Sequence, residues 1–449
     1  MRALLFLAAF SLFPVLSMAA TKEGLTQYQL KNGLDILVIE DHRAPVVVHM
    51  LWYKAGAADE PAGHSGIAHF LEHLLFKATD SLERGEFSKT VAALGGRDNA
   101  FTAWDYTGYY QRVAAKHLER MMQMEASRVR GLRLTEGDIA TERDVILEER
   151  AQRTETNPAA LMREQMMAAQ YSNHRYGVPI SGWRHEAETL SLEDALAFYK
   201  RNYAPNNAIL VVAGDVEPEA VKTLAETYYG PLAPTVDLPK RVRPKEPPQR
   251  AERRLVYKDE RVAQPYVMRS YLAPERNAGD QKGAAALTLF AALLGGDGIN
   301  SYLGEKLQLK DDKAVYVASY YSGLSLDETT FGLIIAPRPE VSLAEAEEAL
   351  DAAVDAFFVE GVDLEKLARL KRQIKASDIY ALDNIEARAN HFGRALVHGL
   401  TLDDALNWND ILQTVTADDI LAAGKRVLNR DRAVTGWLMK DGTDAERSE

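Results

Sequence analysis

A proline-rich segment divides this chain of 449 residues into two parts of similar size. Residues 230–250, which read GPLAPTVDLPKRVRPKEPPQR, contain six of the 17 prolines. Because proline fixes the backbone φ angle and removes an amide donor, we expect this segment to be an extended linker. A chain of this length is also too long for one ordinary hydrophobic core. The sequence therefore predicts two folded domains, residues 21–230 and 252–449, joined by a linker at residues 231–251.

The two parts repeat the same order of predicted elements. The first opens with the strand-like segments TQYQL, LDILVIE and VVVHMLWY, with a turn expected at Asn32-Gly33, and the second opens with RRLVYKD and PYVMRSYLA. An apolar helix follows in each part (GIAHFLEHLLF and AALTLFAALLG), and each part closes with a helix and a strand. The repeated order predicts an α+β fold made of two homologous α/β-roll units, each an antiparallel sheet flanked by helices.

The first 20 residues have the features of a secretory signal peptide. Arg2 gives a positive start, an apolar run that is short for a membrane span follows, and Ser17-Met18-Ala19 fits the small-x-small cleavage pattern. A membrane anchor or a buried first helix is the alternative, but the polar residues after the run favour cleavage. The chain has no cysteine, so export points to a bacterial periplasm more than to a eukaryotic exterior. After removal of the signal peptide we expect no membrane span.

Charge and composition narrow the class of protein. The 47% hydrophobic and 26% charged content is typical of a soluble globular protein. The formal net charge is −12. Nucleic-acid binding depends mainly on lysine and arginine, so we expect no nucleic-acid partner.

The segment HSGIAHFLEHLLF predicts a helix with metal-binding side chains on one face. Helical spacing predicts an apolar face made of Ile67, Phe70, Leu71, Leu74 and Leu75. His69 and His73 are four residues apart, so both imidazoles can reach one zinc ion at ~2.0–2.1 Å per nitrogen. Glu72 points toward the same space and can act as general base toward a water activated by the metal. The pattern H-x-x-E-H reverses the commoner H-E-x-x-H zinc helix; the alternative is two surface histidines beside a solvated glutamate.

A catalytic zinc site needs a third protein ligand. The segment LTEGDIATERDVILEERAQR predicts a helix that begins with a capping box at Thr135 and Asp138. Glu142, Glu148 and Glu149 all lie in it, and spacing alone does not choose among them. Glu142 and Glu149 are seven residues apart and share a face, so one can bind the metal while the other supports a ligand from behind. Alternatively, all three are solvated and paired with neighbouring arginines.

These motifs resemble the pitrilysin/insulinase family of zinc metallopeptidases, which includes the mitochondrial processing peptidase and its bacterial relatives. GHSGIAHFLEHLLFKAT is similar to the signature of that family, and ERDVILEER resembles its downstream helix. The resemblance implies one Zn²⁺ bound by His69, His73 and Glu149, with Glu72 as catalytic base and Glu142 behind a ligand. It also implies a zinc endopeptidase of peptides or small unfolded proteins, whose two homologous units form half of a clam shell.

A third stretch, GGRDNAFTAWDYTGYY, resembles the edge strand with which the family binds its substrate. By this resemblance, Asn99, Ala100, Phe101 and Thr102 pair with the backbone of a peptide substrate. An exposed edge is suited to this role, because an added strand gains affinity through its backbone and specificity through pockets. The alternative is an ordinary sheet strand with polar alternation.

One feature departs from the family pattern. Active members carry an Arg and a Tyr seven residues apart in the C-terminal part, where they help to hold the substrate and the oxyanion. Here Tyr316 is in place, but Leu309 stands where the Arg is expected, and the adjacent Lys310 lacks a guanidinium fork. The resemblance therefore implies a zinc-bearing subunit that works with a homologous partner carrying the Arg/Tyr pair, or else a homodimer. A non-catalytic scaffold or core subunit is the alternative from another function class.

Overall fold

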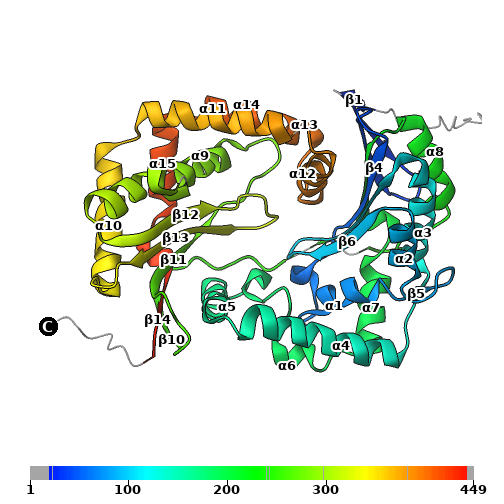
Figure 1. Cartoon of the computed structure of the whole chain (residues 1–449), viewed down its shortest axis with the longest axis horizontal. Coiled ribbons are helices and arrows are strands. Elements are labelled where there is room, and N and C mark those ends of the chain that lie inside the picture. The colour runs from blue at the N-terminus through cyan, green and yellow to red at the C-terminus, as the bar shows by residue number, and fades with distance from the viewer. Residues whose placement is uncertain are drawn as a thin grey trace, which may run out of the picture.

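The computed structural model describes residues 20–441, apart from residues 23, 239, 242, 297 and 382. It contains two units, each a sheet with helices, joined through the proline-rich segment (Figure 1). Residues 1–19 of the predicted signal peptide lie outside the described residues. Within the described part of the chain, no helix combines the length and the apolar character that a membrane crossing requires.

The first unit is built on a seven-stranded sheet with the order β1-β2-β3-β9-β4-β7-β6. The strands are β1 (Ala20–Lys22), β2 (Leu25–Gln29), β3 (Asp35–Glu40), β4 (Val46–Tyr53), β6 (Arg97–Thr102), β7 (Thr107–Ala114) and β9 (Ala208–Gly214). Strands β3 and β9 are parallel, and the other pairs are antiparallel. The predicted turn at Asn32-Gly33 joins β2 to β3, and Gly33 has the positive φ of 87° that favours glycine there.

The second unit is built on a five-stranded sheet with the order β10-β14-β11-β13-β12. Its strands are β10 (Arg253–Lys258), β11 (Tyr266–Ala273), β12 (Ala314–Tyr321), β13 (Thr329–Pro337) and β14 (Ala433–Met439). The outer pair β10/β14 is parallel and the rest are antiparallel. In chain order these strands correspond to β3, β4, β6, β7 and β9, which have the same sheet order and the same directions. The predicted α+β fold of two like units is confirmed.

Helices cover both sheets. Those of the first unit are α1 (Ile67–Leu74), α2 (Glu86–Ala93), α3 (Leu118–Arg130), α4 (Glu136–Arg150), α5 (Pro158–Gln170), α6 (Arg184–Ala187), α7 (Leu192–Asn202) and α8 (Pro218–Tyr228). Those of the second are α9 (Lys282–Ala291), α10 (Leu343–Glu360), α11 (Leu364–Ala381), α12 (Ile385–Val397), α13 (Leu402–Leu406), α14 (Trp408–Thr414) and α15 (Ala417–Val427). Each unit has its own apolar core between one sheet face and its own helices.

Each sheet also receives a helix from the other half of the chain. Helix α12 packs on the face of the first sheet that is turned toward the second unit, opposite α3 and α8, where Phe392 joins a buried cluster that contains Trp52 (Figure 1). Conversely, Met162 and Met166 of α5 pack on the second sheet against Val434. Because burial of apolar surface stabilises both contacts, the two units support each other across the proposed boundary at residues 231–251.

The contact between α12 and β4 gives a stability prediction. A Cβ added at Gly393 would lie 2.4 Å from the indole of Trp52, which is fully buried. We expect Gly393→Ala to lower the free energy of unfolding by about 1–3 kcal/mol through overpacking. In the interior of an unobstructed helix the same change stabilises by about 1 kcal/mol. Gly283→Ala in α9, where the nearest atom is a flexible Arg426 guanidinium at 3.5 Å, is the matched control. Urea unfolding followed by circular dichroism compares the two; equal effects would contradict the packing described.

Candidate metal centre

Helix α1 holds the H-x-x-E-H residues on its polar face. Its apolar side chains are buried in the core of the first unit: Ile67, Ala68, Phe70, Leu71 and Leu74. His69, Glu72 and His73 therefore point away from that core. They are not fully solvated, since only 12% of the His69 side chain and 22% of the His73 side chain are exposed. The spacing of apolar residues thus fixes which side chains face the site.

A buried carboxylate fixes the start of this helix. The N-terminal cap is Gly66, with φ of 91° and no side chain to accept from the first turn. Instead, the backbone N–H groups of Gly66 and Ala68 donate to Glu60 at 3.0 and 2.9 Å. Burial raises the pKa of Glu60 to about 8 in spite of these bonds. Glu60 was missed in the sequence because it lies in the loop before the helix, beyond the reach of an ordinary cap.

Helix α4 brings the acidic residues to α1, beside which it packs (Figure 1). The predicted capping box is confirmed: the Asp138 N–H donates to Thr135 Oγ1 at 3.2 Å, and the Thr135 N–H donates to Asp138 Oδ2 at 2.9 Å. Glu149 lies in the last turn of the helix. Among the three candidates, Glu148 is exposed and bonded to Gln152, so it does not face α1.

Three donor atoms converge between the two helices. Glu149 Oε2 lies 3.6 Å from His69 Nε2 and 3.3 Å from His73 Nε2. Within the described residues, these three side chains form a group whose donor atoms all lie within 4.8 Å of one another. Ligands on a tetrahedral zinc at ~2.0–2.1 Å are separated by roughly 3.3 Å. The donor set and its spacing therefore fit a zinc ion.

The electrostatics of the cluster also suit a cation. Burial, with the charge of His73 next, lowers the pKa of His69 to about 4, so its imidazole is neutral near pH 7, the form that can bind a metal. Burial lowers the pKa of His73 too, but a hydrogen bond to Glu142 and the charges of Glu72 and Glu149 outweigh it and raise the pKa. Carboxylates around two imidazoles thus favour positive charge at this point, which a divalent ion supplies.

Glu142 lies behind His73. His73 Nδ1 donates to Glu142 Oε1 at 3.0 Å, which leaves Nε2 facing Glu149. This hydrogen bond, together with an ion pair to Lys77, lowers the pKa of Glu142 to about 2. Lys77 was missed in the sequence, although it follows His73 by four residues. An arginine, Arg153, pairs in the same way with Glu149.

Glu72 lies between the edge strand β6 and the donor cluster, which consists of His69, His73 and Glu149. Burial raises its pKa, partly opposed by Thr102, whose Oγ1 donates to Glu72 Oε2 at 2.5 Å. Thr102 ends β6, which pairs with β7 on one side and forms an edge of the first sheet among the described residues. Nothing in the sequence linked Thr102 to Glu72, because the contact joins a helix to a strand 30 residues away.

The remaining predicted residues are distributed over both units. Asn99, Ala100 and Phe101 lie on β6, and the Phe101 ring packs 4.9 Å from that of Trp52. Tyr316 lies on β12 in the second unit and is 53% exposed. The structure therefore gathers the two histidines, Glu72, Glu142, Glu149 and Thr102, and no described contact joins Tyr316 to them.

Two family models match the chain. Residues 35–183 match the model described as Insulinase (Peptidase family M16), and residues 189–374 match the one described as Peptidase M16 inactive domain. The first match includes the whole donor cluster together with Glu72, Glu142 and β6.

Individual proteins are similar over most of the chain. The zinc protease PqqE of Helicobacter pylori is 30% identical over 374 residues, which is 82% of each protein. An uncharacterized zinc protease of Streptomyces coelicolor is 28% identical over 386 residues, covering 85% of this chain and 82% of the relative.

Solved structures share the fold. A protease from Helicobacter pylori superposes with a TM-score of 0.85 at 27% identity, covering 92% of this chain and 98% of that one. The first half of the periplasmic protease PqqL from Escherichia coli gives 0.78 at 20% identity, covering 93% and 92%. The longer PqqL chain matches 94% of this chain over only 48% of its own length, with a TM-score of 0.80 and 19% identity. That protein is thus about twice as long as this one.

Proposed function

The chain belongs to the insulinase family of peptidases, peptidase family M16, and from this premise we propose that it is a zinc-dependent endopeptidase of peptides or small unfolded proteins. The observation that carries the proposal is the convergence of the His69, His73 and Glu149 donor atoms, all within 4.8 Å, beside a half-buried Glu72. Relatives that cover most of the chain are named zinc proteases, which supports the same metal here.

Each residue of the site has a chemical role in this proposal. Zinc held by the two histidines and Glu149 would polarise the scissile carbonyl and acidify a water molecule. Glu72 accepts a proton from the attacking water and delivers it to the nitrogen of the leaving amine. Thr102 orients the Glu72 carboxylate through its hydrogen bond. Glu142 fixes the His73 tautomer that leaves Nε2 free to bind the metal.

Strand β6 would bind the substrate. Its outer edge has no partner strand among the described residues, so its backbone groups are available to a peptide. A peptide added there as a further strand gains affinity from main-chain hydrogen bonds, whatever its sequence. Because Thr102 at the end of β6 contacts Glu72, such a peptide lies next to the general base.

We also infer a partner subunit. This chain corresponds to one half of the longer PqqL chain, and Leu309, 60% exposed, stands where an arginine is expected. Residues 189–374 match a family model described as an inactive domain. In agreement with this match, the described residues of the second unit contain no group that could hold a metal ion. The Arg/Tyr pair would then come from a homologous chain. The features of residues 1–20 and the periplasmic location in the name of PqqL support export.

Reconstitution with a homologue tests this proposal. We expect the purified chain to bind zinc but to cleave peptides slowly, and a homologue that carries the Arg/Tyr pair to raise kcat/KM by about 100-fold or more, because oxyanion donors contribute on that scale. The rate is measured on a quenched fluorescent peptide. A chelator should abolish the restored activity, and added zinc should return it. Full turnover by a homodimer of this chain alone would contradict the need for the partner.

A further inference from the structure

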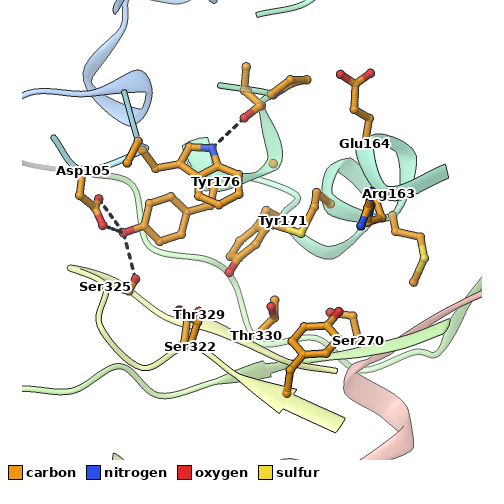
Figure 2. A pocket seen from close by; sticks show the side chains of 18 of the residues that line it. Asp105, Arg163, Glu164, Tyr171, Tyr176, Ser270, Ser322, Ser325, Thr329 and Thr330 are labelled. Carbon is orange, nitrogen blue, oxygen red and sulfur yellow. Dashed lines mark hydrogen bonds between the residues drawn. The ribbon is translucent and has the colours of Figure 1, made fainter. Parts of the chain in front are cut away.

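A cavity of about 480 Å³ lies between the two units, next to the turn that joins β6 to β7 (Figure 2). Its walls come from both units: residues 103–106 of that turn, helix α5 and the segment 171–179 that follows it, the second sheet at β11, β12 and β13 with the loop 322–325, and Arg394 and His398. Pockets that bind organic ligands usually have volumes of roughly 300–1,000 Å³. The cavity is therefore large enough for an aromatic side chain.

This cavity adjoins the proposed substrate strand. The turn that lines it begins immediately after Thr102, which donates a hydrogen bond to the proposed general base Glu72. A peptide that pairs with β6 and continues past Thr102 would therefore bring its side chains to the cavity. Alternate side chains of an added strand point to the same side, so one position of the peptide would face the opening.

Aromatic rings in the wall are held in place by their polar ends. Trp104 Nε1 donates to the carbonyl of Val178 at 2.9 Å, and Tyr171 Oη donates to the carbonyl of Glu328 at 2.8 Å. Tyr176 Oη donates to both carboxylate oxygens of Asp105 at 2.7 Å (Figure 2). With their polar atoms satisfied, these rings can offer apolar surface to a ligand without having to be ordered when it binds.

The acidic groups of the wall are already paired. Asp105 pairs with Arg243 and lies 3.3 Å from His398 Nε2, in addition to its bond from Tyr176. The other acid, Glu164, is bonded twice to Arg150, at 2.7 and 2.9 Å. Exposed Arg163 and Arg394 also line the cavity. A basic side chain would therefore find no unpaired carboxylate there and would meet two cations.

We propose that this cavity is a specificity pocket that receives an aromatic side chain of the peptide bound along β6. The inference rests on the proposed function. It adds a preference for one kind of substrate side chain, which the metal site alone does not determine. A phenylalanine, tyrosine or tryptophan at one fixed distance from the scissile bond would enter the pocket, and a lysine or arginine at that position would be rejected.

A set of alanine- and glycine-rich peptides, with a single phenylalanine moved position by position, tests the pocket. Binding is measured by fluorescence anisotropy on zinc-loaded Glu72→Gln protein, and cleavage on the parent protein with its partner. At one position, phenylalanine should improve binding and kcat/KM by about 10-fold or more over alanine, and lysine should not. No dependence on position, or a preference for lysine, would overturn the proposal.

Two substitutions fill the cavity from opposite walls. Thr330→Trp enters from β13 and Ala160→Phe enters from α5. Either should remove the preference for phenylalanine, so that the phenylalanine-containing and all-alanine peptides bind with similar affinity. Val315→Trp adds the same indole on β12 at an exposed position outside the cavity, and should keep the preference.

If both filled variants retain the preference for phenylalanine, the proposal of a specificity pocket is wrong. The binding readout separates this proposal from the peptidase proposal. If the parent protein cleaves no peptide, anisotropy on the Glu72→Gln protein still shows whether one aromatic position is preferred. Cleavage without any preference at one position would instead preserve the peptidase and exclude the pocket.

Discussion

Replacement of Glu149 by glutamine is expected to remove the metal and, with it, measurable peptide hydrolysis. Glu149 Oε2 lies 3.6 and 3.3 Å from the Nε2 atoms of His69 and His73, so it completes the donor set. Glutamine keeps the size of the side chain but lacks the negative charge that a zinc ligand contributes. We expect the affinity for zinc to fall by more than about 100-fold. Removal of a residue that only supports a metal ligand lowers the affinity by up to about 100-fold, and Glu149 is proposed to be a ligand itself.

Glu148→Gln is the matched control, because it makes the same chemical change one residue away. Glu148 is exposed and bonded to Gln152 on the same helix, so its carboxylate does not face the donor cluster. Both variants are dialysed against buffered zinc, and their bound metal is measured by atomic emission. Stoichiometric zinc in Glu149→Gln, or equal loss in both variants, would contradict the assignment of Glu149.

The parts of the structure that the sequence predicted well are local. The opening and closing strands of both units, the Asn32-Gly33 turn and the capping box at Thr135 and Asp138 depend on neighbouring residues, and the structure confirms them. The polar face of α1 follows from helical spacing in the same way. On α4, in contrast, spacing alone did not show which of three glutamates faces the metal position, because that depends on how α4 packs against α1.

Contacts between segments that are distant in the chain could not be predicted from the sequence. Thr102 reaches Glu72 across 30 residues, and Glu60 caps α1 from the preceding loop. The reciprocal packing of α5 and α12 was also missed, since an apolar helical face does not indicate which sheet it covers. Such pairings are set by the tertiary fold and not by local preference.

The proline-rich segment is more than a spacer. It was predicted to be extended, and its described residues form no helix or strand. However, the Arg243 side chain is only 5% exposed and pairs with Asp59, Asp105 and Asp327, which come from both units. Arginine is usually solvated, so its burial could not be read from composition. The segment therefore connects the units through buried ion pairs at one wall of the proposed pocket.

Glu72→Gln addresses the chemistry itself. The Glu72 side chain is half-buried, and this burial raises its pKa, as is useful in a group that must take up and release a proton. It is not one of the three donors that converge on the metal position. The amide of glutamine can still accept a hydrogen bond from Thr102 but cannot accept the proton. We therefore expect unchanged zinc content and a kcat lower by about 10²–10⁴-fold.

The most direct measurement is peptide hydrolysis by zinc-loaded Glu72→Gln protein beside the parent, each with its partner subunit and with bound zinc determined in the same samples. We expect one equivalent of zinc in both samples and a loss of at least about 100-fold in kcat for the variant alone. Undiminished cleavage by a variant that retains its zinc would contradict the assigned mechanism.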